Sequence, residues 1–100
     1  MTKHEYLLTV AAEECAEIQQ AICKSLRFGL GSTHPDDPRL TNSTQILIEY
    51  SQLESVMKMM FDEGMLEPLD FNERAAVWDN KEEKVKKYME VSRGLGRLDF

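Results

Sequence analysis

From Lys3 to Phe28 the sequence contains 26 residues without a proline or a glycine, the two residues that most disfavour a helix interior, and this favours one long helix. Apolar residues recur in it at intervals of three and four, the spacing that marks one face of an amphipathic helix. They are Leu7, Val10, Ala11, Ile18, Ala21, Ile22 and Leu26. We therefore expect a helix from about Lys3 to Phe28, which ends where Gly29 can adopt a non-helical conformation.

A second amphipathic helix is expected in the middle of the chain. The prolines at 35 and 38 exclude helix from residues 32–38, so this segment is predicted to be a loop. The following helix has several possible caps, Thr41, Asn42, Ser43 and Thr44, and Gln45 stands in the capping-box position relative to Asn42. Gly64 ends this helix after about Glu63.

The last third of the chain carries two further helix-start signals. Asp70 is followed three residues later by Glu73, and Asp79 is followed by Glu82 at the same spacing. We expect two helical pieces with a break near Asp79. Since no alternation typical of strands is evident, the predicted fold class is all-α, a helical bundle that forms a single domain over residues 1–100.

Composition excludes several classes of function. The net charge of −6 argues against binding to duplex nucleic acid, which needs a cationic face. No stretch approaches the roughly 20 apolar residues of a membrane span, and the N-terminus lacks an apolar signal region, so we expect a cytoplasmic protein that does not enter the membrane.

Any metal site in this chain is expected to use oxygen ligands. Cys15 and Cys23 lie eight residues apart on the predicted helix, about 12 Å along its axis, which is too far for a disulfide. No Cys-x-x-Cys or His-x-x-x-His spacing is present, and His4 and His34 lie outside any metal-binding pattern. We therefore expect reduced cysteines and no zinc site.

The chemistry most strongly indicated is a carboxylate site. Glu14 interrupts the apolar stripe of the first helix, and Glu17 lies one turn further along the same face. Glu49 lies beside the apolar stripe of the second helix, so it would meet these two if the helices pack antiparallel. Charges this close repel by up to about 4 kcal/mol per pair at 4 Å and an effective dielectric of 20, and a bound cation reverses that sign. Magnesium suits such ligands. The alternative is a solvated acidic helix face.

The order and spacing of these residues resemble a known family. Glu13-Glu14-x-x-Glu17 and Glu49-x-x-Gln52 are similar to the Glu-Glu-x-x-Glu and Glu-x-x-Asp signature of the all-α (MazG-like) nucleoside triphosphate pyrophosphohydrolases. Further features resemble small members often encoded by bacteriophages, for which the location would be the host cytoplasm; they are Lys24-Ser-Leu-Arg27-Phe28-Gly29, Asn42 and Lys84-Val85-x-x-Tyr88.

The resemblance implies hydrolysis of a nucleoside triphosphate between its α and β phosphates, with magnesium or manganese as cofactor. The metal ligands carried over are Glu14, Glu17, Glu49 and Gln52, and the catalytic residue, which would orient or deprotonate water, is Glu13. Gln52 departs from the family pattern, because an amide oxygen stands where an aspartate is expected.

Lys24 and Arg27, one turn apart, are candidates to bind substrate phosphate, and the alternative is a pair of solvated cations near a helix C-terminus. Aromatic residues at helical spacing are expected in the core rather than on a base.

Two other functional hypotheses remain open from the sequence. The neutral Gln52 is compatible with a catalytically weak or inactive protein that binds and sequesters nucleotides on the same scaffold. A helical interaction protein is the third reading. Because a few short helices bury little surface alone, and because of the resemblance, we expect a homodimer or homotetramer.

Overall fold

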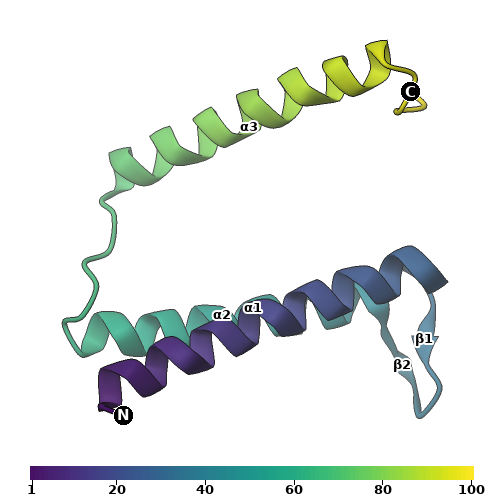
Figure 1. The fold of residues 1–100 in the computed structure, drawn as a ribbon. Coiled ribbons are helices and arrows are strands. Elements are labelled where there is room, and N and C mark those ends of the chain that lie inside the picture. Colours follow the sequence, from purple (N-terminus) through teal and green to yellow (C-terminus); the bar gives the residue numbers. More distant parts are fainter. The chain divides into compact units, whose positions relative to one another are not determined.

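The computed structural model describes residues 1–100, which form three helices and a short β-hairpin (Figure 1). Along the chain these are α1 (Lys3–Phe28), β1 (Thr33–His34), β2 (Asp37–Thr41), α2 (Asn42–Asp62) and α3 (Phe71–Gly94). The chain divides into two compact units, Met1–Glu67 and Pro68–Phe100. The mostly helical structure confirms the predicted all-α character of the chain. The expectation of a single domain stays a prediction.

Helix α1 has the predicted bounds because both of its ends carry the appropriate local chemistry. The Thr2 hydroxyl accepts a hydrogen bond from the Glu5 amide at 3.1 Å, and the Glu5 carboxylate accepts one from the Thr2 amide at 3.1 Å. Gly29 ends the helix with a φ of 94°, which a residue with a side chain adopts with strain.

The segment predicted to be a loop contains an antiparallel hairpin, so that expectation was wrong in part. Thr33 pairs with Thr41 and His34 pairs with Asp37, with a register irregularity between the two pairs. The prolines exclude helix as expected, but Pro38 is tolerated in β2 because each strand of a two-stranded ribbon has a free edge where no N–H is needed.

Helix α2 begins where it was predicted, and of the possible caps the chain uses Thr41. The Thr41 hydroxyl accepts from the Thr44 amide at 3.2 Å, while Gln45 turns away to bond Glu49, so the capping box expected between Asn42 and Gln45 does not form. Asn42 instead donates its side-chain amide to the carbonyl of Gly29 at 2.9 Å and ties the start of α2 to the end of α1.

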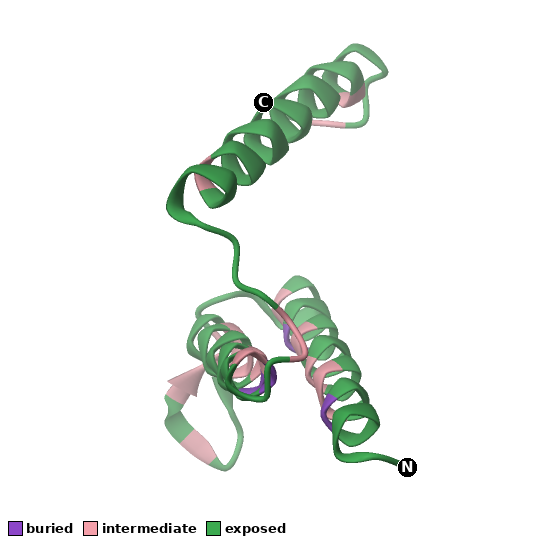
Figure 2. Ribbon diagram, turned by 90° about the vertical axis from the view of Figure 1, so that its left-hand side faces the viewer, coloured by how far each residue is buried: buried purple, intermediate pink, exposed green.

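Helices α1 and α2 pack antiparallel against each other. Lys3 at the start of α1 forms an ion pair with Glu63 after the end of α2, and the contact of Asn42 with Gly29 marks the other end of the pair. The buried core lies near the first of these ends, and a further buried residue, Ala21, lines a cavity together with residues of the hairpin. Most of the chain is exposed (Figure 2). This core consists of Leu7, Val56 and Met60, with Val10, Ala11, Met57, Met65 and Leu66 packed against it.

The second unit contains α3, which begins as predicted but shows no break. The Asp70 carboxylate accepts from the Glu73 amide at 2.8 Å, and the Glu73 carboxylate completes the capping box at 3.1 Å. At the second expected start, Glu82 pairs with Lys86 at 2.8 Å instead of folding back to cap at Asp79, so the predicted break near Asp79 was wrong.

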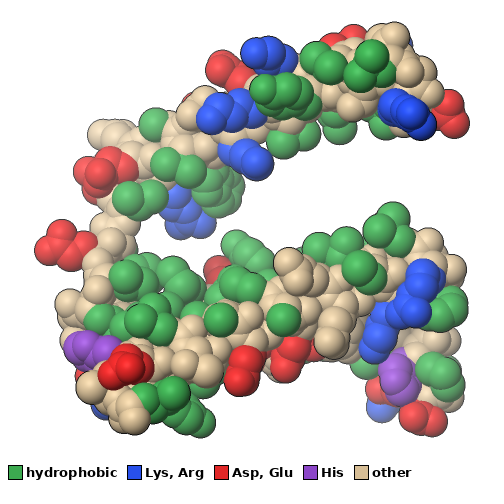
Figure 3. All heavy atoms as spheres, viewed as in Figure 1, with side chains coloured by type: hydrophobic (Ala, Val, Ile, Leu, Met, Phe, Trp, Pro, Cys, Tyr) green, Lys and Arg blue, Asp and Glu red, His purple; other side chains and the backbone are tan.

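No side chain of α3 is buried, and its large apolar residues are among the most exposed in the chain. Hydrophobic side chains lie along its surface in the view of Figure 3. None of the three helices combines the length and the apolar character needed to cross a bilayer.

Candidate metal centre

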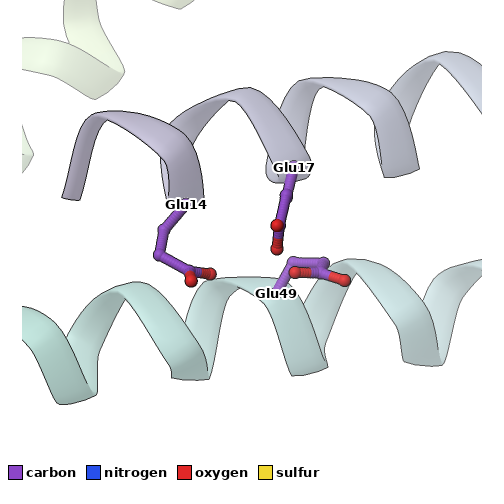
Figure 4. Close-up of side chains that lie close together, drawn as sticks. All are labelled: Glu14, Glu17 and Glu49. Carbon is purple, nitrogen blue, oxygen red and sulfur yellow. The ribbon is translucent and has the colours of Figure 1, made fainter. Parts of the chain in front are cut away.

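Three glutamates from two helices come together on the inner side of the α1–α2 pair. Glu14 and Glu17 extend from α1 and Glu49 extends from α2, so that the side chains meet between the helices (Figure 4). One carboxylate oxygen from each residue lies within 4.8 Å of those of the other two. The sequence predicted this convergence from the antiparallel packing of the helices.

Helical spacing explains how α1 supplies two of the three groups. Glu14 follows Val10 and Ala11, which pack on the core, and Glu17 precedes the buried Ala21 by one turn. The face that α1 turns toward α2 is therefore apolar before and after the carboxylates and acidic between them. A position of this kind costs stability unless something compensates the charge.

The electrostatics of the cluster are unfavourable for three unaccompanied anions. Oε2 of Glu14 and Oε2 of Glu49 are buried and have no hydrogen-bond partner. No lysine, arginine or histidine forms an ion pair with any of the three. The pKa of Glu17 is raised above its ordinary value of 4.5, first by a hydrogen bond shared with Glu49 and then by the charge of Glu14.

Gln45 holds one member of the cluster in place. Its side-chain amide donates to Oε1 of Glu49 at 2.5 Å, which leaves Oε2 of Glu49 as the unpartnered atom. Glu49 lies one turn after Gln45 on α2. This i, i+4 spacing is the sequence signal from which their hydrogen bond could have been predicted. Gln45 was predicted to take part in a capping box, so this role was missed.

The donor set fits a hard divalent cation. All three groups offer oxygen, which magnesium and manganese prefer, and no nitrogen or sulfur ligand is close enough to favour zinc. Ligands on opposite sides of a magnesium ion at 2.1 Å are about 4.2 Å apart, so the 4.8 Å span needs only a small contraction. Two carboxylate oxygens already lie without partners in the space such an ion would share.

The other two residues of the predicted signature lie outside this cluster of three. Gln52 is exposed and lines a separate shallow groove on α2 together with Thr44 and Ile48. Glu13 is exposed on α1 and forms no ion pair. Their assignment as metal ligand and catalytic residue stays a prediction.

Two hollows lie toward the C-terminal half of α1, and the first of them adjoins the carboxylates. An inner cavity of about 270 Å³ is lined by residues of α1, the hairpin and α2, including Glu17, Glu49 and Lys24. An outer hollow of about 520 Å³ on α1 is lined by Lys24 and Arg27. Neither cation is paired with a carboxylate, and the Arg27 guanidinium stacks over the Phe28 ring at 5.1 Å.

Comparison with known proteins gives no match to a protein-family model, to a curated protein or to a solved structure.

Proposed function

We propose that this protein is a magnesium-dependent nucleoside triphosphate pyrophosphohydrolase of the all-α (MazG-like) type, active in the cytoplasm. The observation that supports this most is the meeting of Glu14, Glu17 and Glu49 within 4.8 Å, with two buried oxygens that no group of the chain satisfies. The unpaired Lys24 lines the same cavity as Glu17 and Glu49, and the unpaired Arg27 follows it one turn further along α1, so a divalent ion and the phosphates that such an ion accompanies would both have partners.

In this proposal each charged residue has one task. Glu14, Glu17 and Glu49 hold the ion, which when bound polarises the phosphoryl group and orients water. Lys24 and Arg27 bind phosphate oxygens, for which the planar guanidinium of arginine is well suited. Glu13 accepts the proton of the attacking water. Water adds to the α phosphorus, the bond to the bridging oxygen breaks, and the products are the nucleoside monophosphate and pyrophosphate.

A second candidate function is nucleotide binding without efficient turnover. It is favoured by Gln52, which is neutral and lines a groove on α2 other than the cavity beside the carboxylates. With three charged ligands instead of four, the ion would be held less tightly, and a bound nucleotide would be sequestered rather than cleaved.

The proposal includes a homodimer or homotetramer. Only four side chains are buried in the whole chain, and α3 contributes none of them. Phe71, Trp78 and Tyr88 are 85%, 61% and 59% exposed, which is unusual for large aromatic residues of a stable monomer. Packing of α3 against a second copy would remove this apolar surface from water.

The test is pyrophosphate release from a panel of nucleoside triphosphates, measured with and without magnesium. We expect magnesium-dependent release that falls by about 100-fold or more in Glu14→Gln, because that variant loses a metal ligand. Glu54→Gln is the matched control, since Glu54 is an exposed glutamate of α2 outside the cluster, and it should leave the rate unchanged.

Other outcomes discriminate between the candidates. Tight, magnesium-dependent binding of a triphosphate with no pyrophosphate release would favour the sequestering protein. If neither nucleotides nor magnesium raise the melting temperature, both nucleotide functions are excluded and the helical interaction protein remains.

A further inference from the structure

The inner cavity, which Glu17 and Glu49 line, and the outer hollow share two side chains of α1, Gln20 and Lys24, but differ in chemistry. The outer hollow contains both unpaired cations, Lys24 and Arg27. Beyond Lys24 and the two glutamates, the inner cavity is lined by neutral polar and apolar groups from the hairpin and the helices. A ligand with a polyanionic part and an uncharged part would therefore place them in different hollows.

The inner cavity offers an apolar surface together with hydrogen-bond acceptors. Ala21 and Leu40 supply the apolar part. Asn42 and Gln45 each donate an amide hydrogen within the chain, to Gly29 and to Glu49, so their amide oxygens stay free to accept. Such a lining suits the flat face and the N–H groups of a heterocyclic base.

The hairpin adds a donor to the same cavity. His34 of β1 lines it, and Nδ1 of its imidazole accepts a hydrogen bond from the Asp36 amide at 3.1 Å. Because Nδ1 accepts, Nε2 is the ring nitrogen that is available as a donor, and it has no partner within the chain. An imidazole held in this way can donate to a carbonyl or hydroxyl oxygen of a ligand.

We propose that the hairpin side of the inner cavity receives the nucleoside of the substrate and that His34 is a specificity-determining residue. The α phosphate then lies at the side of the same cavity that Glu17 and Glu49 line, and the remaining phosphates extend past Lys24 toward Arg27. This inference rests on the proposed function and adds to it the element that reads the nucleoside, the β1–β2 hairpin. The hairpin is then part of the binding site as well as a connection between α1 and α2.

The experiment compares two probes by calorimetric titration in the presence of magnesium. One is inorganic tripolyphosphate, and the other is a set of nucleoside triphosphates whose α–β bridging oxygen is replaced by methylene to prevent cleavage. We expect the best nucleotide to bind the wild-type protein about tenfold or more tightly than tripolyphosphate. His34→Ala should weaken that nucleotide by about three- to tenfold, the effect of one hydrogen bond, and leave tripolyphosphate unchanged.

Two further variants separate recognition from a general effect on the hairpin. His34→Gln keeps a donor and should restore part of the affinity for the nucleotide. Thr33→Ala is the matched control, because Thr33 is the exposed neighbour of His34 in β1, does not line the cavity and forms no side-chain hydrogen bond. It should bind both probes as the wild type does.

The possible failures are distinct. Equal affinity of the wild-type protein for tripolyphosphate and for every nucleotide would overturn this inference alone, as would equal weakening of both probes by His34→Ala. Absence of magnesium-dependent binding of either probe would overturn the proposed function itself.

Discussion

Glu17 is the exposed member of the carboxylate cluster. Its replacement distinguishes two effects of this side chain, its role as a metal ligand and its repulsion of the other two carboxylates. In Glu17→Gln the cation loses a ligand and the metal-free protein loses one of three adjacent negative charges. We expect the variant to melt at a higher temperature than the wild type without magnesium, because the repulsion is relieved. With magnesium the order should reverse.

The size of the magnesium effect follows from ligand linkage. A hundredfold excess over the dissociation constant stabilises the wild type by about 2.7 kcal/mol, which raises the melting temperature of a chain of this size by about 10 to 20 °C. Thermal unfolding of the wild type, Glu17→Gln and the control Glu54→Gln measures it. A magnesium response in Glu17→Gln as large as that of the wild type would contradict the assignment of Glu17 as a ligand.

The raised pKa of Glu17 predicts a pH dependence with a definite sign. The hydrogen bond with Glu49 and the charge of Glu14 favour the protonated form in the folded state. The contribution of this group to the free energy of unfolding is therefore fully present below its ordinary pKa of 4.5 and is lost as the pH rises through the raised value. Above that range the carboxylates are charged and the site is ready for a cation.

We therefore expect magnesium to stabilise the protein less at pH 5 than at pH 8, since protons and the cation compete for the same oxygens. Melting temperatures with and without magnesium across this range measure the effect. Glu17→Gln provides the reference, because it removes the titrating group. A magnesium response that does not change with pH in the wild type would contradict the prediction.

At the scale of the elements, Asn42 joins the end of α1 to the start of α2 through its bond to the Gly29 carbonyl. Asn42→Ala removes this bond, and we expect the free energy of unfolding to fall by about 1 kcal/mol. Denaturant unfolding measures the change. Asn72→Ala is the matched control, because Asn72 is an exposed residue in the first turn of α3 with no side-chain hydrogen bond, and it should not destabilise the protein.

The elements that could be predicted from the sequence are those that depend on neighbouring residues alone, without a competing contact. Helix α1 was predicted correctly because no proline or glycine interrupts its apolar periodicity, and the start of α3 because Asp70 and Glu73 close a capping box there. The predicted break near Asp79 was wrong because an Asp-x-x-Glu motif in the interior of a helix can form i, i+4 ion pairs instead of a cap. There Glu82 bonds Lys86, which lowers the pKa of Glu82 and continues the helix.

The parts that could not be predicted depend on contacts between segments. The hairpin contains few residues, two prolines and no alternation, so only its backbone pairing identifies it as a hairpin. The cavity that it closes with α1 and α2 was equally invisible, and His34 was accordingly left without a role. The carboxylate cluster could be anticipated because helical spacing and an antiparallel pair were sufficient to bring Glu14, Glu17 and Glu49 together.

For the whole molecule, the exposed apolar residues of α3 predict self-association. Val85 is 44% exposed, and a lysine at this position would put a charge in an interface built on the apolar side of α3. We expect the wild type to be a dimer or tetramer in sedimentation experiments and Val85→Lys to shift it toward the monomer. Glu83→Lys introduces the same residue on the opposite side of the helix and should not. A wild type that stays monomeric at all concentrations would contradict this prediction.

The apolar core of the α1–α2 pair lies at one end, where Leu7, Val56 and Met60 are buried, while the hairpin end is held by Ala21 and by backbone and amide hydrogen bonds. The two ends should therefore undergo local unfolding at different rates. Amide hydrogens at the end of α1 and the start of α2 should exchange with deuterium through local opening. Those around Met60 should exchange much more slowly, because their exchange requires global unfolding. A ligand could thus gain entry next to the carboxylates while the rest of the helix pair remains closed.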